Sequence, residues 1–246
     1  MTEDAQRTIR AARQQLETLQ LFGVDFTPTG GGQERPQVTP GQSSSTTTAA
    51  SPAAKAEALE RLRQEHEAAC PHCTTATAHN RIVFGEGNAD AQVMFIGEAP
   101  GAEEDRTGRP FVGRAGQKLD DMIRAMELTR EDVYIGNILK SRPPNNRTPQ
   151  PDEVAGCAPY LAEQIRIIQP TVIVALGGPA TKWLLDTKIG ITNLRGQWGL
   201  YRDDELAIDV MPTFHPAYLL RNYTRDARQK VWSDLQAVIK RLRDEA

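Results

Sequence analysis

The chain has 246 residues, of which 39% are hydrophobic and 25% are charged, and its net charge is −3. This length suits one domain with a sizeable core plus appendages. The net charge argues against an architectural protein that holds long stretches of duplex DNA, because such proteins are usually basic. No apolar run approaches the length of a membrane-spanning helix, and the acidic, polar start does not resemble a signal peptide. We therefore expect a cytoplasmic protein, monomeric and without a membrane partner.

The chain divides into three predicted parts. Residues 1–27 have helical character, because their apolar residues recur at loosely helical spacing. Residues 28–54 are rich in Gly, Ser, Thr and Pro and cannot bury a core, so we interpret them as a disordered linker. The main domain is then predicted to occupy residues 55–246.

Helical and strand patterns alternate along this main domain. Helices are predicted at 55–69, 116–126, 152–168, 179–185 and 224–243, and apolar strands at 92–97, 132–137, 171–176 and 209–214. Apolar strands separated by helices indicate a parallel sheet that is covered on both faces. The sequence therefore predicts an α/β fold.

The loop after the first of these strands carries the most informative motif, I-G-E-A-P-G-A-E-E-D-R-T-G-R-P-F-V-G, at residues 96–113. It contains four carboxylates, those of Glu98, Glu103, Glu104 and Asp105. An α/β sheet places its chemistry on such loops, just past the carboxyl end of a strand. The alternative is a solvated acidic turn, but such a turn has no use for a large apolar ring like that of Phe111. We expect Glu103 and Asp105 to be solvated.

Two more segments follow predicted strands. The first, V-Y-I-G-N-I-L-K at residues 133–140, places Asn137 at a strand end. The second, M-P-T-F-H-P-A-Y-L-L-R at residues 211–221, places His215 in the same position on another strand. Taken singly, these residues have structural alternatives: an asparagine that caps a turn, and a histidine with a purely structural role.

Together and in this order, the three segments resemble the uracil-DNA glycosylase superfamily, and above all its family 4, the iron–sulfur type of bacteria and archaea. The resemblance runs from about residue 70 to residue 222. It implies a three-layer α/β/α sandwich around a mainly parallel four-stranded sheet. It also implies a monofunctional enzyme of base excision repair, which hydrolyses the N-glycosidic bond of deoxyuridine in DNA, releases uracil and leaves an abasic site. Two alternatives remain: a non-catalytic module that binds uracil-containing or damaged DNA, and a glycosylase for another deaminated base.

The resemblance implies catalytic roles for three side chains. Glu98 would orient the attacking water and stabilise positive charge on the sugar. The amide of Asn137 would pair with the Watson–Crick edge of uracil and would be mispaired by cytosine. A neutral His215 would donate a hydrogen bond to uracil O2 as negative charge builds there.

The substrate-binding residues are expected around these three. Phe111 would stack on the extruded base, and Glu104 would crowd the 5-position and exclude the methyl group of thymine. The carbonyl of Ala99 would help to hold the water, and Leu219 would wedge into the gap that the base leaves. Phosphate contacts are expected from the side chains of Lys140, Arg142 and Arg221 and from the N–H groups of Gly177 and Gly178.

The chain has three cysteines, Cys70, Cys73 and Cys157, and this odd count argues against a disulfide framework. Family 4 binds a [4Fe–4S] cluster through four cysteines, and in this chain Ser141 stands at the third of the four positions. Full thiolate ligation is the normal arrangement for such clusters. Three alternatives follow: Ser141 ligates the fourth iron, His72 replaces it, or the cluster is absent and the cysteines are residual or bind zinc. We favour a structural cluster with an unusual fourth ligand.

Residues 17–22, E-T-L-Q-L-F, resemble the short peptide by which bacterial proteins bind the sliding clamp. Those peptides usually begin with Gln, where this chain has Glu17. A tethered peptide would raise the local concentration of the enzyme at replicated DNA. The alternative is a helix that packs on its own domain.

Overall fold

The computed structural model describes residues 50–203 and 206–245 of the chain. The predicted N-terminal segment and the clamp-like peptide lie outside the described residues, as does most of the predicted linker. The first described helix, α2 (Pro52–Ala69), begins three residues before the expected start of the domain. The side chain of Ser51 accepts a hydrogen bond from the N–H of Ala54, and proline stands at the first helical position, so both residues favour a helix start here.

A mixed sheet of six strands lies at the centre of the described domain, in the order β1-β3-β2-β4-β6-β5. Its four inner strands are parallel and match the four predicted ones: β3 (Tyr134–Asn137), β2 (Val93–Gly97), β4 (Val172–Leu176) and β6 (Ala207–Thr213). The predicted number of strands was wrong, because an antiparallel strand is added at each edge: β1 (Glu86–Gly87) on β3 and β5 (Gly199–Arg202) on β6. Neither edge strand contains the apolar run by which the inner strands are recognised.

The two central strands, β2 and β4, are buried on both faces, as their continuous apolar sequences predict. Successive side chains of one strand therefore enter two different cores. In β2, Met94 and Ile96 belong to one core, and Val93 and Phe95 to the other.

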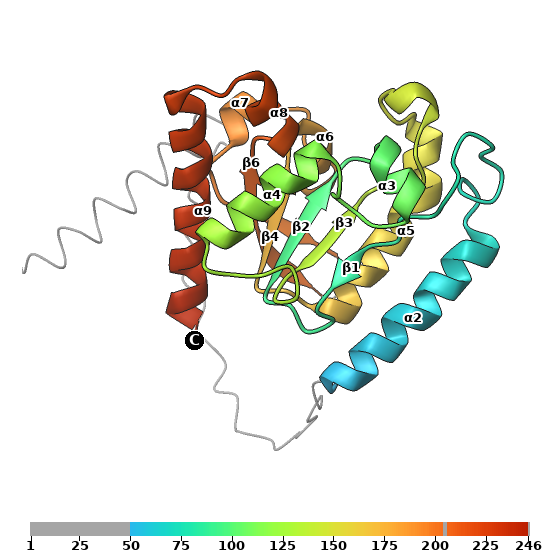
Figure 1. Ribbon diagram of the computed structural model, residues 1–246. Coiled ribbons are helices and arrows are strands. Elements are labelled where there is room, and N and C mark those ends of the chain that lie inside the picture. The colour runs from blue at the N-terminus through green and yellow to red at the C-terminus, as the bar shows by residue number, and fades with distance from the viewer. Residues whose placement is uncertain (1–49, 204–205, 246) are drawn as a thin grey trace, which may run out of the picture. The chain divides into compact units, whose positions relative to one another are not determined.

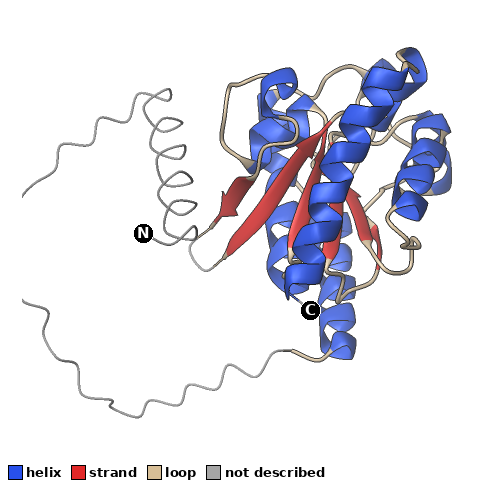
Figure 2. Ribbon diagram, turned by 90° about the vertical axis from the view of Figure 1, so that its left-hand side faces the viewer, coloured by secondary structure: helices blue, strands red, loops and turns tan. Residues whose placement is uncertain are grey.

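Helices cover both faces of the sheet, so the predicted three-layer sandwich is confirmed (Figure 2). One core contains residues of α5 (Pro151–Ile168) and α6 (Gly178–Leu184), and α2 packs against α5 (Figure 1). The other core contains residues of α4 (Arg114–Ala125), α8 (Pro216–Arg221) and α9 (Arg225–Glu245). The shorter helices are α3 (Ala102–Thr107), α7 (Ile191–Leu194) and the 3-10 helix η1 (Pro144–Asn146).

The parallel strands bring their carboxyl ends to one edge of the sheet. The loops after β2, β3, β4 and β6 therefore meet there, and these loops carry the motifs identified in the sequence. Among the described residues, no helix combines the length and the apolar character needed to span a bilayer.

Candidate active site and metal centre

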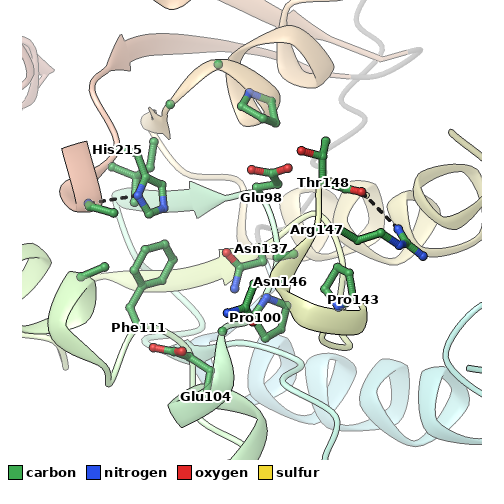
Figure 3. Close-up of a pocket in the computed structure, with 18 of the residues that line it drawn as sticks. Glu98, Pro100, Glu104, Phe111, Asn137, Pro143, Asn146, Arg147, Thr148 and His215 are labelled. Atoms are coloured by element: carbon green, nitrogen blue, oxygen red, sulfur yellow. Dashed lines mark hydrogen bonds between the residues drawn. The ribbon is translucent and has the colours of Figure 1, made fainter. Parts of the chain in front are cut away.

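A cavity of about 550 Å³ lies at the carboxyl edge of the sheet (Figure 3). This volume is in the usual range for small-molecule sites. The cavity is lined by most of the residues that the sequence nominates: Glu98, Ala99, Glu104, Phe111, Asn137, Gly177, Gly178, His215 and Arg221. The fold therefore brings together side chains that are widely separated in the chain.

Asn137 is the last residue of β3, and its side chain is buried with the Oδ1 atom lacking a hydrogen-bond partner in the described part of the chain. Leaving such an acceptor unpaired costs about 1–3 kcal/mol. Gly97 maintains the space in front of this atom, since a Cβ there would come within 2.4 Å of Oδ1. The amide is therefore ready to accept a hydrogen bond from a ligand in the cavity.

Phe111 forms one side of the cavity, and its ring centroid lies 5.7 Å from that of His215 (Figure 3). Its φ angle of 51° is in the left-handed region, which is uncommon for a residue other than glycine. The next helix approaches this turn closely, since a Cβ on Gly116 would come within 1.8 Å of the Phe111 carbonyl oxygen. The apolar ring of Phe111 thus lies beside His215 in the cavity.

Two charged side chains hold the Phe111 loop in place. The guanidinium of Arg130 donates to the carbonyl oxygens of Pro110 (2.7 Å) and Phe111 (3.1 Å). Glu104 Oε1 accepts the N–H groups of Val112 (2.9 Å) and Gly113 (2.8 Å). Glu104 thus has a structural task that the sequence did not indicate, and no sequence motif nominated Arg130.

His215 is the N-cap of α8, where its Nδ1 accepts the N–H of Ala217 at 3.1 Å. In the neutral ring the proton is then on Nε2, which is the donor available to the cavity. Burial, assisted by the charge of Arg221, lowers the pKa of His215 to about 4. The imidazole is consequently uncharged at neutral pH, as the predicted role requires.

Glu98 directly follows β2, and its half-buried side chain lines the cavity. Its carbonyl oxygen accepts the N–H of Leu139 at 3.1 Å, which joins the loops after β2 and β3. Burial raises the pKa of the Glu98 carboxyl above its usual value.

Two other carboxylates of the same motif differ from each other in exposure, because Glu103 is exposed whereas Asp105 is buried. The expected solvation of Asp105 was wrong, since its Oδ1 accepts the N–H of Asn80 at 2.7 Å.

The predicted phosphate contact by Lys140 was wrong. This side chain is fully buried, and its Nζ donates to the carbonyl oxygen of Asn137 (2.9 Å) and to Gln164 Oε1 (2.5 Å). Desolvation lowers its pKa to about 8. Lys140 therefore supports the strand end that carries Asn137, and it is not accessible to DNA.

Two further expectations about DNA contacts were also wrong. Leu219 is 3% exposed and belongs to the core that contains Leu119 of α4, so it does not project as a wedge. The N–H of Gly177 donates to the carbonyl oxygen of Thr213 at 2.9 Å and is not available to a phosphate.

Arg142 is a different case, because its side chain stays partly accessible. It donates to Asn146 Oδ1 at 2.6 Å and keeps 25% of its side chain exposed.

The three cysteines meet at a second site, together with a histidine that the sequence reading missed. One donor atom from each of His66, Cys70, Cys73 and Cys157 lies within 4.8 Å of the others, and all four residues are buried. This set is suited to a metal ion. His66 stands one helical turn before Cys70 on α2, and this i, i+4 spacing is the signal that could have identified it.

The donor set departs from four-thiolate ligation of a [4Fe–4S] cluster. The chain has three cysteines, and at the fourth position Ser141 Oγ lies 3.3 Å from Cys73 Sγ. The same hydroxyl lies 3.1 Å from His72 Nε2. The residues present therefore fit a metal ion, but they do not fit the cluster in its usual ligation.

Comparison with known proteins agrees with the motifs. A model of the uracil DNA glycosylase superfamily matches residues 84–236. A type-4 uracil-DNA glycosylase of Thermotoga maritima is 46% identical, over 73% of this chain and 93% of that protein. A type-4 enzyme of Sulfurisphaera tokodaii is 44% identical, over 68% and 77%, and a type-5 enzyme of Pyrobaculum aerophilum is 31% identical, over 56% and 67%.

The chain belongs to the uracil-DNA glycosylase superfamily. Within the superfamily it is placed in family 4, because the type-4 relatives are the more similar. The resemblance that the motifs indicated is thereby confirmed.

Proposed function

We propose that this protein is a monofunctional uracil-DNA glycosylase of base excision repair, which hydrolyses the N-glycosidic bond of deoxyuridine and leaves an abasic site. The observation that carries this proposal is the unpaired, buried Oδ1 of Asn137 in a cavity shared with Phe111, His215 and Glu98. The type-4 relatives support the same activity.

Base recognition rests on Asn137 and Phe111. Oδ1 of Asn137 would accept the N3–H of uracil, and the amide Nδ2 would donate to O4. Cytosine presents an acceptor at N3 and a donor at position 4, so both of its groups would be mispaired and rejected. The ring of Phe111 would stack on the extruded base, which contributes about 1–3 kcal/mol.

Bond cleavage rests on His215 and Glu98. As the bond from C1′ to N1 breaks, its electron pair moves onto uracil, and the Nε2–H of neutral His215 would stabilise the charge at O2. The carboxylate of Glu98 would stabilise the positive charge on the sugar and orient a water, with help from the carbonyl of Ala99. Water adds to C1′ and releases one proton to solvent, and uracil leaves as an anion that takes up one proton from solvent.

Contacts to the DNA backbone are proposed for Arg221, Arg142 and the N–H of Gly178. Arg221 is exposed at the rim of the cavity. Exclusion of the thymine methyl is proposed for Glu104, acting from its place beside the loop that carries Phe111. We infer that uracil-containing DNA is the partner.

Other features remain proposals from the sequence. These are a clamp contact through residues 17–22, a monomeric state and a cytoplasmic location. The family resemblance also implies a [4Fe–4S] cluster bound by Cys70, Cys73, Cys157 and Ser141, but the donor set of this chain supports a single metal ion instead.

The activity is tested with a labelled oligonucleotide that carries one uracil, followed by alkaline cleavage of abasic sites. Thymine- and hypoxanthine-containing strands are the controls. Cleavage at uracil alone would support the proposal, and cleavage at hypoxanthine would assign a broader range of bases. Binding of the uracil strand without cleavage would instead support the non-catalytic module.

The pH dependence of the reaction is expected to depend on Glu98. Below the pKa of this carboxyl the group is protonated and neutral, so kcat/KM should fall on the acid side, with a midpoint above the usual 4.5 because burial raises the pKa. His215 adds no step near neutral pH, since it loses its charge above about pH 4. Single-turnover rates between pH 4 and 9 would be measured for the protein and for Glu98→Gln. The variant should lose about 10²-fold or more in rate, together with the acid limb.

Glu103→Gln is the matched control. This substitution also removes one carboxylate charge, but at an exposed residue of the same motif that does not line the cavity. Its profile should coincide with that of the unmodified protein. An acid limb that persists in Glu98→Gln would assign the titration to another group.

A further inference from the structure

We propose that His66, Cys70, Cys73 and Cys157 bind a single zinc ion, at the place where family 4 is expected to hold an iron–sulfur cluster. This inference does not depend on the glycosylase activity. It rests on the spacing of the donor atoms, on their chemistry and on the environment of His66.

All four donor atoms lie within 4.8 Å of one another, and two of the pairs have the spacing of ligands around one ion. In tetrahedral zinc sites Zn–S is about 2.3 Å and Zn–N about 2.0 Å, so neighbouring sulfurs lie about 3.8 Å apart and a sulfur and a nitrogen about 3.5 Å apart. Here Cys73 Sγ and Cys157 Sγ are 3.6 Å apart, and Cys157 Sγ and His66 Nε2 are 3.7 Å apart. A [4Fe–4S] cluster binds each ligand through a different iron, so its ligands stand further apart.

The donor chemistry also suits zinc. Three cysteines and one histidine form a standard structural zinc set, and Cys70 and Cys73 have the C-x-x-C spacing that is usual in such sites. Backbone N–H groups point at two of the sulfurs, from Lys140 to Cys157 Sγ at 3.1 Å and from Cys73 to Cys70 Sγ at 3.5 Å. Such donors stabilise thiolates, which are the form that binds the metal.

The environment of His66 favours coordination. The side chain is fully buried, with its ring edge-on to Tyr160 at 4.7 Å and tilted against Phe84 at 5.8 Å. Its Nδ1 has no hydrogen-bond partner in the described part of the chain, and its Nε2 faces Cys157 Sγ. A metal bound by Nε2 would give this buried nitrogen a partner, which offsets part of the cost of burying the polar ring.

The two other candidate ligands are less suitable. Ser141 Oγ and His72 Nε2 lie 3.1 Å apart and satisfy each other. A serine hydroxyl is also a harder donor than a thiolate, and it would have to lose its proton to replace one. Ser141 is therefore assigned to the surroundings of the metal, and His66 is assigned as the fourth ligand.

The metal content of the full chain tests the proposal directly. The protein would be purified without oxygen from an iron-supplemented culture, so that an oxygen-labile cluster would survive, and zinc, iron and acid-labile sulfide would be measured. We expect one zinc per chain and no sulfide. Iron and sulfide in comparable amounts, or a folded protein without metal, would overturn the proposal.

Variants then test the ligand assignment. His66→Ala should weaken zinc binding at least tenfold in competition with a chelator, whereas His66→Cys should keep the metal in a four-cysteine site. Ser141→Ala is the matched control and should bind zinc as the unmodified protein does. Cobalt(II) substitution gives an independent spectrum, which should change in both His66 variants and stay the same in Ser141→Ala.

A loss of metal from Ser141→Ala, with His66→Ala unaffected, would refute the assignment. If His66→Ala does not fold, the cobalt spectrum of His66→Cys still decides the question, because an unchanged spectrum would exclude His66 as a ligand. None of these readouts uses uracil release, so the zinc site and the glycosylase activity can fail separately.

Discussion

Replacing Asn137 with alanine is expected to lower the rate of uracil release by about 10²–10³-fold, as the loss of one key donor does in other enzymes. The variant can no longer pair with the uracil edge in the cavity. Within residues 50–203 and 206–245, Oδ1 makes no hydrogen bond, so its removal breaks none there. Single-turnover kinetics on a uracil oligonucleotide would give the rate, and thermal unfolding would give the stability.

Asn88→Ala is the control for this experiment. Asn88 precedes β2, at the edge of the sheet opposite the cavity, and its Oδ1 accepts the N–H of Asp90. This variant should release uracil at the normal rate. If Asn137→Ala retained full activity, the base would have to be recognised elsewhere, and an equal loss of affinity for uracil-free DNA would assign Asn137 to backbone binding.

His215 is expected to have two separable tasks. Its Nδ1 caps α8, and its Nε2–H would donate to the leaving base in the cavity. His215→Ser retains a good N-cap residue but lacks the second donor, whereas His215→Ala lacks both. We expect both variants to lose about 10²–10³-fold in kcat.

The two variants should differ in stability. His215→Ala should be less stable than His215→Ser by about 1 kcal/mol, which is the usual value of an N-cap. Chemical denaturation would measure the difference, and single-turnover assays would measure the chemistry. Normal activity in His215→Ser would mean that the histidine only caps the helix.

The inner sheet could be predicted because buried parallel strands are continuous apolar runs, as in Val172–Leu176. The edge strands could not be predicted. Strand β1 (Glu86–Gly87) is only two residues long, and one of them is a glycine. Strand β5 (Gly199–Arg202) is only partly buried. Both strands form because a neighbouring strand, β3 or β6, offers backbone hydrogen-bonding groups to them. This pairing depends on the tertiary structure and not on the local sequence.

The site was predictable as a set of residue types at strand ends, but the direction of each side chain was not. From the sequence, Lys140 is a candidate phosphate ligand, yet its side chain is buried and its Nζ donates to the carbonyl oxygen of Asn137. Leu219 looks like a wedge, yet α4 covers it. His66 was overlooked because it lies among charged residues of a helix, and only the approach of α5 with Cys157 reveals its partners.

The metal centre also has a consequence for the stability of the fold. A metal bound there would join Cys73 to Cys157, which are 84 positions apart in the sequence. A metal that binds the folded chain in preference to the unfolded chain stabilises the fold by mass action, by about 2.7 kcal/mol when the free metal concentration is 100 times Kd. The bound metal would therefore act as a reversible cross-link that ties α2, which lies outside the region matched by the family model, to the rest of the domain.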